Sequence, residues 1–194
     1  MSHRARLLFT GLLAVTLTAH AAALLEHVPL KWKATSNLSL PLSATPETTL
    51  QFEAFKDARA NKELIAENSE DEKKVKPVTT SDDVGAFVST HMHDLFKQSG
   101  YNVVDTGATV IVRGEVTQFF VRETGTYQSE VSVHMTFESA SGAKLWSGTA
   151  SGEATRFGRS YKLENYDEAL SDAIVDATSS MLKSAELQKA LAGH

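Results

Sequence analysis

The sequence predicts a small α+β fold, a two-layer sandwich in which two helices cover one face of a largely antiparallel sheet. Three patterns support this fold: alternating apolar residues indicate about five strands, two apolar stripes have helical spacing, and two tight turns give consistent strand registers. The expected order is strand, helix, four strands, helix. A length of 194 residues suits one such domain preceded by a targeting segment.

Residues 1–21 have the organisation of a signal peptide. Two arginines open the segment, residues 7–17 form an apolar run, and Ala19-His20-Ala21 supplies the small residues that precede a cleavage site. We therefore expect export to the periplasm and a mature chain that begins near Ala22. The alternative is an uncleaved anchor in the inner membrane that faces the periplasm, because residues 7–25 are long enough to cross a bilayer.

Composition argues against several classes of function. The net charge is −5 at pH 7 and no dense basic patch is present, which argues against a nucleic-acid partner. The sequence contains no cysteine, so disulfides, thiolate zinc sites and thiolate nucleophiles are excluded. No cofactor is expected, and composition leaves the oligomeric state open.

Residues 22–47 are predicted to be a tether, and residues 48–194 the folded domain. The tether has no sustained apolar period, and its second half is rich in serine, threonine and proline. Such a segment stays unstructured unless it docks on the domain, because ordering its backbone costs entropy. Trp32 is the residue best suited to make that contact.

The domain is expected to open with an alternating strand at residues 50–54, followed by a highly charged, exposed excursion at residues 57–78. Thr80-Ser81-Asp82-Asp83 is typical of a helix start, and Gly100 of a left-handed helix end. Between them runs one apolar stripe: Val84, Phe87, Val88, His91, Met92, Leu95 and Phe96.

After a short strand at residues 101–104, two hairpins are predicted. A turn at Thr124-Gly125 joins strands 109–123 and 127–138, and places Val116 opposite Val133. A second turn, at Ser141-Gly142, leads into the last strand. It places Met135 opposite Gly148, Val131 opposite Gly152 and Phe137 opposite Trp146. The expected core residues of this meander are Val116, Val133, Met135 and Trp146.

The closing helix is expected to begin at Asn165, with Glu168 three residues later as a capping-box partner, and a short last turn covers residues 184–191. Gly148 and Gly152 leave room for a helix to approach the sheet closely. With Gly114, they could instead line a cavity between the sheet and the helices.

No catalytic or metal-binding set is evident. His91 and His93 stand two apart on a helix, so they point in different directions, and His91 belongs to the apolar stripe. The hairpin register places Glu115 opposite His134, which suits either an acid–base pair or an ordinary cross-strand contact. No nucleophile could be assigned to that pair, so an enzyme is not expected.

The sheet face away from the helices offers a candidate partner-binding surface. By strand alternation from the long strand's start, Ile111, Phe119 and Val121 should point outward on that face. An exposed apolar cluster of this kind is typical of a protein–protein contact.

Four segments resemble the YajG-type family of uncharacterised Gram-negative envelope lipoproteins: residues 55–59, residues 110–116, residues 166–174 and residues 187–191. The likeness covers residues 48 to 191. Members of that family carry a lipid-modified cysteine that this chain lacks, so lipid anchoring is not implied.

Together these observations predict a non-enzymatic accessory or binding protein of the bacterial cell envelope, which contacts another envelope protein. Peripheral association with a membrane is left open. The alternative is a periplasmic carrier of a small ligand or lipid, with a cavity between sheet and helices.

Overall fold

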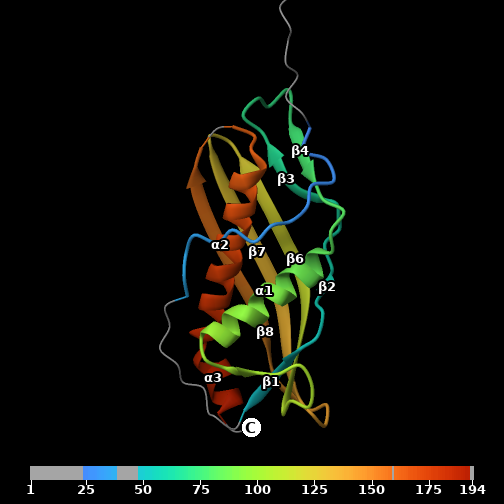
Figure 1. Cartoon of the computed structure of the whole chain (residues 1–194), viewed down its shortest axis with the longest axis vertical. Helices are drawn as coiled ribbons and strands as arrows, with labels where there is room; N and C mark the ends of the chain where they lie inside the picture. Colours follow the sequence, from blue (N-terminus) through green and yellow to red (C-terminus); the bar gives the residue numbers. More distant parts are fainter. Residues whose placement is uncertain (1–23, 39–47, 159, 193–194) are drawn as a thin grey trace, which may run out of the picture.

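A computed structural model describes residues 24–38, 48–158 and 160–192 (Figure 1). The predicted signal peptide, residues 1–21, lies outside these residues. The elements are β1 (Thr49–Phe52), β2 (Lys56–Asp57), β3 (Leu64–Asn68), β4 (Lys76–Thr79), α1 (Val84–Gln98), β5 (Asn102–Val103), β6 (Val110–Glu123), β7 (Thr126–Ser139), β8 (Lys144–Phe157), α2 (Leu163–Leu182) and α3 (Ala185–Leu191).

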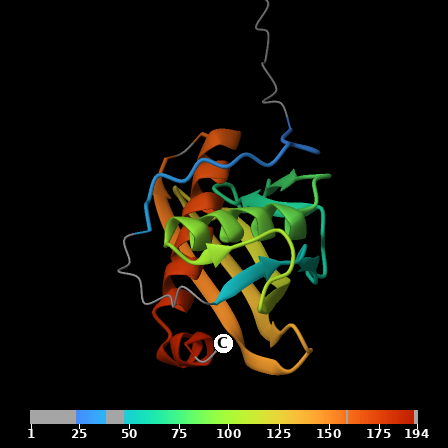
Figure 2. The same cartoon turned by 60° about the horizontal axis from the view of Figure 1, so that its bottom comes forward.

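The fold is α+β, as predicted, and is built on one mixed sheet. The long strands β6, β7 and β8 form an antiparallel meander. The other side of β6 pairs in succession with β1, β2 and β3, all parallel to it. β5 extends the sheet beside β1, and β4 extends it beside β3. The two long helices lie together on one face (Figures 1 and 2).

Among the described residues the sheet has eight strands rather than about five, because β3 and β4 lie largely within the predicted charged excursion at residues 57–78 and β2 lies at its start. Ile65, Ala66 and Val78 are fully buried within β3 and β4. β3 has three consecutive apolar residues and β4 has Val78 beside a proline, so neither strand shows a recognisable alternation. The interpretation of this segment as exposed is therefore wrong for β3 and β4, whereas residues 60–63 and 70–75 are exposed.

Both predicted hairpin registers are confirmed where the core lies. Val116 pairs with Val133, and Met135 pairs with Gly148. All three apolar residues are fully buried. Trp146 is only half-buried, with its indole lying over Gly148.

A β-bulge at Thr117 exchanges the faces of β6. The ladder steps from Val116 opposite Val133 to Gln118 opposite Ser132, so one extra residue lies on β6. Residues after the bulge therefore alternate in the opposite phase. The prediction that Phe119 and Val121 point outward is wrong for this reason: their exposed fractions are 1% and 0%.

The first long helix starts directly after the predicted segment, residues 80–83, but its cap is Asp83 rather than the expected Thr80 or Ser81, and its first turn holds no acid. In α1, Asp83 caps the first turn by accepting a hydrogen bond from the Ala86 amide (3.0 Å), and Gly100 has a φ of 80°. The second helix begins before Asn165, and its N-cap Lys162 makes no side-chain capping bond. The predicted capping box is therefore wrong.

Three glycines allow close packing beneath the helices. A methyl group at Gly152 would lie 2.1 Å from the Ala177 nitrogen, so the backbone of α2 rests directly on β8. At Gly114 the same position is filled by the Phe55 ring, and at Gly148 by Trp146. The space beside each glycine is therefore occupied by protein.

The N-terminal strap, residues 24–38, docks on the domain. The Val28 amide donates a hydrogen bond to the Thr79 carbonyl (2.8 Å), and Val28 is buried. Farther along, the strap crosses α2 (Figure 2), where Asp172 accepts bonds from the Thr35 and Ser36 amides. No helix in the described ranges is long and apolar enough to cross a membrane.

Candidate functional site

The outer face of the sheet, away from α1 and α2, is mostly polar. On β7 and β8 the alternate residues that face this side are serine, threonine, glutamate, glutamine and histidine, together with Leu145 and Phe157 near the two ends of β8. Of the three residues predicted for a partner-binding face, only Ile111 lies here, half-buried. Phe119 instead packs inside against Phe87, with ring centroids 6.1 Å apart. The structure thus does not bring the three predicted residues together.

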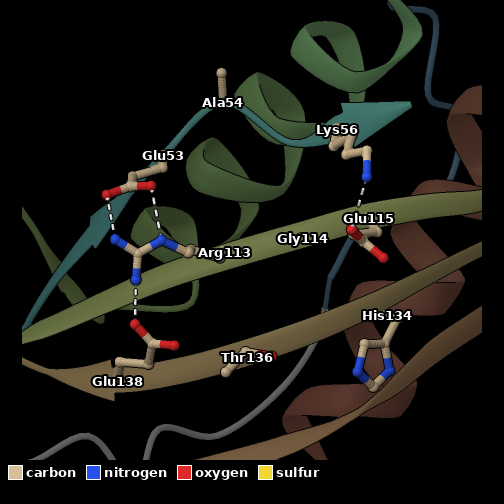
Figure 3. Close-up of a pocket in the computed structure, with 9 residues that line it drawn as sticks. All are labelled: Glu53, Ala54, Lys56, Arg113, Gly114, Glu115, His134, Thr136 and Glu138. Carbon is tan, nitrogen blue, oxygen red and sulfur yellow. Dashed lines mark hydrogen bonds and ion pairs between the residues drawn. The ribbon is translucent and has the colours of Figure 1, made fainter. Parts of the chain in front are cut away.

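A hollow of about 300 Å³ lies on the outer face over β6 and β7 (Figure 3). At one end, Arg113 makes two hydrogen bonds to Glu53 (2.9 and 2.8 Å) and a third to Glu138. The arginine is nearly half exposed, so these ion pairs contribute little to stability. They do fix the position of the guanidinium and neutralise it.

At the other end of the hollow, the predicted pairing of Glu115 with His134 is confirmed. Ser147, which sequence reasoning did not assign, places its Oγ 3.2 Å from His134 Nε2. The carboxylate, however, forms an ion pair with Lys56 at 3.3 Å (Figure 3), and Ser147 also donates to the Met135 carbonyl (3.2 Å). An acid that does not orient the imidazole does not complete a Ser-His-acid triad.

The two histidines of α1 do not converge on a common point. His91 lies between two aromatic rings, with centroids 4.1 Å from Trp32 and 4.5 Å from Phe87, and burial lowers its pKa. His93 contacts Asp94 (2.8 Å) on a more exposed side of the helix. No group of three metal-ligating side chains occurs among the described residues.

Glu123 is a fully buried carboxylate that the sequence did not single out. It accepts hydrogen bonds from the Tyr166 hydroxyl and from the Ser160 and Tyr161 amides. Although burial alone would raise its pKa, these bonds hold that pKa below its ordinary value. The Glu123 carboxylate links the end of β6 to the start of α2, and these hydrogen bonds give it a structural role.

The second hollow on the outer face brings two carboxylates together, and Arg122 also lines it. It measures about 530 Å³ and is lined in part by Phe120, Glu130 and Glu153. Glu130 and Glu153 are direct cross-strand partners, an arrangement that is normally destabilising. In the described part of the chain, neither carboxylate forms an ion pair with a cation.

The edge of β8 lies beside this pair. Within the described residues, β8 pairs only with β7, so one side of a 14-residue strand lacks a partner strand. The Glu153 amide points toward that side, where it donates to Asp176 (3.0 Å). Because donors alternate along an antiparallel strand, Thr149 and Ser151 also face the free edge.

The chain belongs to a known family. A family model described as "Uncharacterized lipoprotein" (Lipoprotein_16) matches residues 47–192. This confirms the resemblance seen in the sequence. No curated protein matches the chain.

Solved structures are similar to this chain at low sequence identity. The protein XCC0632 from Xanthomonas campestris, of family DUF330, is 10% identical with a TM-score of 0.56, over 84% of this chain and 99% of that one. A PelC dodecamer from Paraburkholderia phytofirmans is 14% identical with a TM-score of 0.45, over 73% and 93% of the two chains. At such identities the likeness concerns the fold alone.

Proposed function

We propose that this protein is a non-enzymatic accessory protein of the bacterial cell envelope that works in the periplasm by contact with another envelope protein. Membership of a lipoprotein family supports the envelope. The observation that carries the contact is the unpaired edge of β8. A long edge favours addition of a strand from a partner, since its amides and carbonyls can pair with one; the Glu153 amide, which donates to Asp176, is the exception.

The side chains along β8 suit such an addition. Residues 147–152 are serine, glycine, threonine and alanine, so an incoming strand can approach without a steric barrier. The Glu130–Glu153 pair favours a lysine or arginine on the partner strand, because that cation would relieve the repulsion between the carboxylates. The partner is therefore expected to supply an extended, basic segment.

The carrier alternative receives no specific support. It requires space between the sheet and the helices, and the positions beside Gly114, Gly148 and Gly152 are filled by Phe55, Trp146 and α2.

Ser151 provides a test with a matched control. Ser151→Pro removes one edge-facing amide at a position where proline is tolerated, whereas Ser151→Ala keeps that amide. Both variants lose the bond between the Ser151 and Ser132 hydroxyls equally. Co-purification of the envelope partner should be lost in the proline variant and retained in the alanine variant, with both melting as folded proteins.

A photo-crosslinking residue makes the same test without disturbing the edge. Placed at Thr149, it should capture the partner, and placed at Arg113, in the first hollow, it should not. Retention of the partner by Ser151→Pro, or capture from Arg113 alone, would overturn the proposed contact.

A further inference from the structure

The exposed large apolar side chains of the described chain gather at one end of the molecule. They are Leu24, Val75 and Phe157, with exposed fractions of 59%, 47% and 92%. We call this region, together with the β3–β4 loop, the strap end.

The strand registers place these residues on a common level. A single row of partners runs across the sheet from Lys76 through Asn68 and Glu123 to Tyr127 and Arg156. Val75 and Phe157 each lie one residue beyond this row. Leu24 precedes Leu25, which pairs with Val78 of β4, so the strap begins at the same end (Figure 1).

Hydrogen bonds fix the first described residues of the strap to the domain. The Leu25 amide donates to the Tyr161 hydroxyl (3.1 Å), which in turn donates to the Pro77 carbonyl (2.9 Å). The Thr79 amide donates to the Leu25 carbonyl (2.9 Å). Residues 1–23 therefore connect to the domain at the strap end.

Lysines flank one of the apolar residues of this end, Val75. They are Lys73, Lys74 and Lys76, and Lys76 lies 5.2 Å from the centre of the Tyr161 ring. Three acids, residues 70–72, precede them in the loop, so the loop is close to neutral overall in an acidic chain. Lysines beside apolar side chains suit an interface with lipid headgroups, where the stems lie along the apolar layer and the ammonium groups reach phosphate.

We propose that the strap end rests on a lipid surface, with Leu24, Val75 and Phe157 at the level of the headgroups and the long axis of the meander directed away from the membrane. The apolar run at residues 7–17 precedes this end in the sequence, so a retained N-terminal segment would hold it at the bilayer. The proposal does not depend on the β8 contact, and it would leave that edge free for a partner.

The absence of cysteine makes the orientation measurable. A chain that begins at Ala22 keeps every described contact. Fitted with an N-terminal histidine tag, it can be held on vesicles of phosphatidylethanolamine and phosphatidylglycerol through a nickel-chelating lipid. Single cysteines at Val75 and Phe157 then carry an environment-sensitive fluorophore. Ser141→Cys, in the turn at the opposite end of β7, is the control, roughly 45 Å away along the strand.

Labels at Val75 and Phe157 should shift to shorter wavelength and be quenched several-fold more by spin-labelled lipid than the label at Ser141. Adding Leu24→Ser to the Val75→Cys protein, and then Phe157→Ser, should reduce that quenching stepwise. Equal quenching at both ends would overturn the proposal. Quenching that is unchanged by the serine substitutions would also overturn it, because the tag alone would then account for the proximity. Circular dichroism checks that each variant is folded.

Discussion

Two aspartates of α2 meet the strap in opposite electrostatic situations. Burial raises the pKa of Asp167 from its ordinary value of 3.8 to about 6, and among the described residues the only donor to its carboxylate is the Lys31 amide, at 3.4 Å. Burial also acts on Asp172, but bonds from Thr35 and Ser36 hold its pKa below the ordinary value. Asp172 also forms an ion pair with Arg156 at 3.0 Å. Ionised Asp167 therefore destabilises the fold, whereas ionised Asp172 stabilises it.

Substitution by asparagine should separate these roles. A raised carboxyl pKa means that ionised Asp167 destabilises the fold above about pH 6 and that this cost disappears as the pH falls toward 4. Asp167→Asn should therefore raise the free energy of unfolding at pH 7.5 by on the order of 1 kcal/mol, with no gain near pH 4. Urea titrations at several pH values measure this difference. A loss of stability at pH 7.5 would contradict the assignment.

Asp172→Asn should act in the opposite direction. Its amide group would face the donors of Thr35 and Ser36, and the Arg156 guanidinium would lose one of its two carboxylate partners while keeping Glu168. We expect a loss of about 2–4 kcal/mol between pH 5 and 8. Because the pKa of Asp172 is depressed, the deficit should persist at moderately acidic pH and shrink only as the wild-type carboxylate itself becomes protonated, below its ordinary pKa. The same urea series tests both aspartates.

At the scale of elements, the bulge in β6 determines which of two adjacent phenylalanines is part of the core. Phe119 is buried and Phe120 is half-exposed on the outer face, although strand alternation from Val110 predicts the reverse. Phe119→Ser should lower the free energy of unfolding by roughly 3–5 kcal/mol, because a large apolar side chain leaves the core. Phe120→Ser should change it by less than about 1 kcal/mol. Denaturant unfolding of the two variants shows which of the two residues faces the core.

The contact of α2 with β8 depends on Gly152. A Cβ there would lie 2.1 Å from the Ala177 nitrogen and 2.3 Å from the Ala173 oxygen, both of them backbone atoms that cannot move alone. Gly152→Ala should therefore cost roughly 3 kcal/mol or more. Gly142 has a φ of 86° but open space around it, so Gly142→Ala should cost only about 1 kcal/mol of backbone strain. Melting temperatures that fall equally would contradict this packing.

The elements that could be predicted are those whose signal is periodic and local. The apolar stripe of α1 and the two hairpin registers come from side-chain spacing, and the structure confirms them. A bulge adds one residue without an unusual amino acid to mark it, so Thr117 and the phase change beyond it could not be anticipated. The prediction that Ile111, Phe119 and Val121 form a partner-binding face is wrong for this reason. The β8 edge could have been inferred, since the last strand of a meander has one neighbour unless the chain returns to it.

The whole molecule includes a segment that the sequence did not place in the fold. The strap was predicted to be a tether, and the family match begins at residue 47, after it. In the structure, Trp32 stacks on His91, as its aromatic character suggested, and the strap backbone is held by side chains of α2. The recognising groups, such as Ser171 and Asp172, stand more than 130 residues away in the chain, beyond the reach of local patterns.

Removal of the strap should therefore weaken the whole domain. A chain that begins at Ser39 loses the bonds from the Lys33 and Thr35 amides to α2, and it uncovers apolar surface beneath Val28 and Trp32. Ordering the strap costs backbone entropy, which offsets much of this gain, so we expect a net loss of roughly 2–4 kcal/mol in the free energy of unfolding. A chain that begins at Leu24 is the control and should match the longer protein. Hydrogen exchange should locate the change in α2 and the start of α1, and leave β6 and β7 protected. Equal stability of the two truncated chains would mean that the strap only rests on a domain that is complete without it.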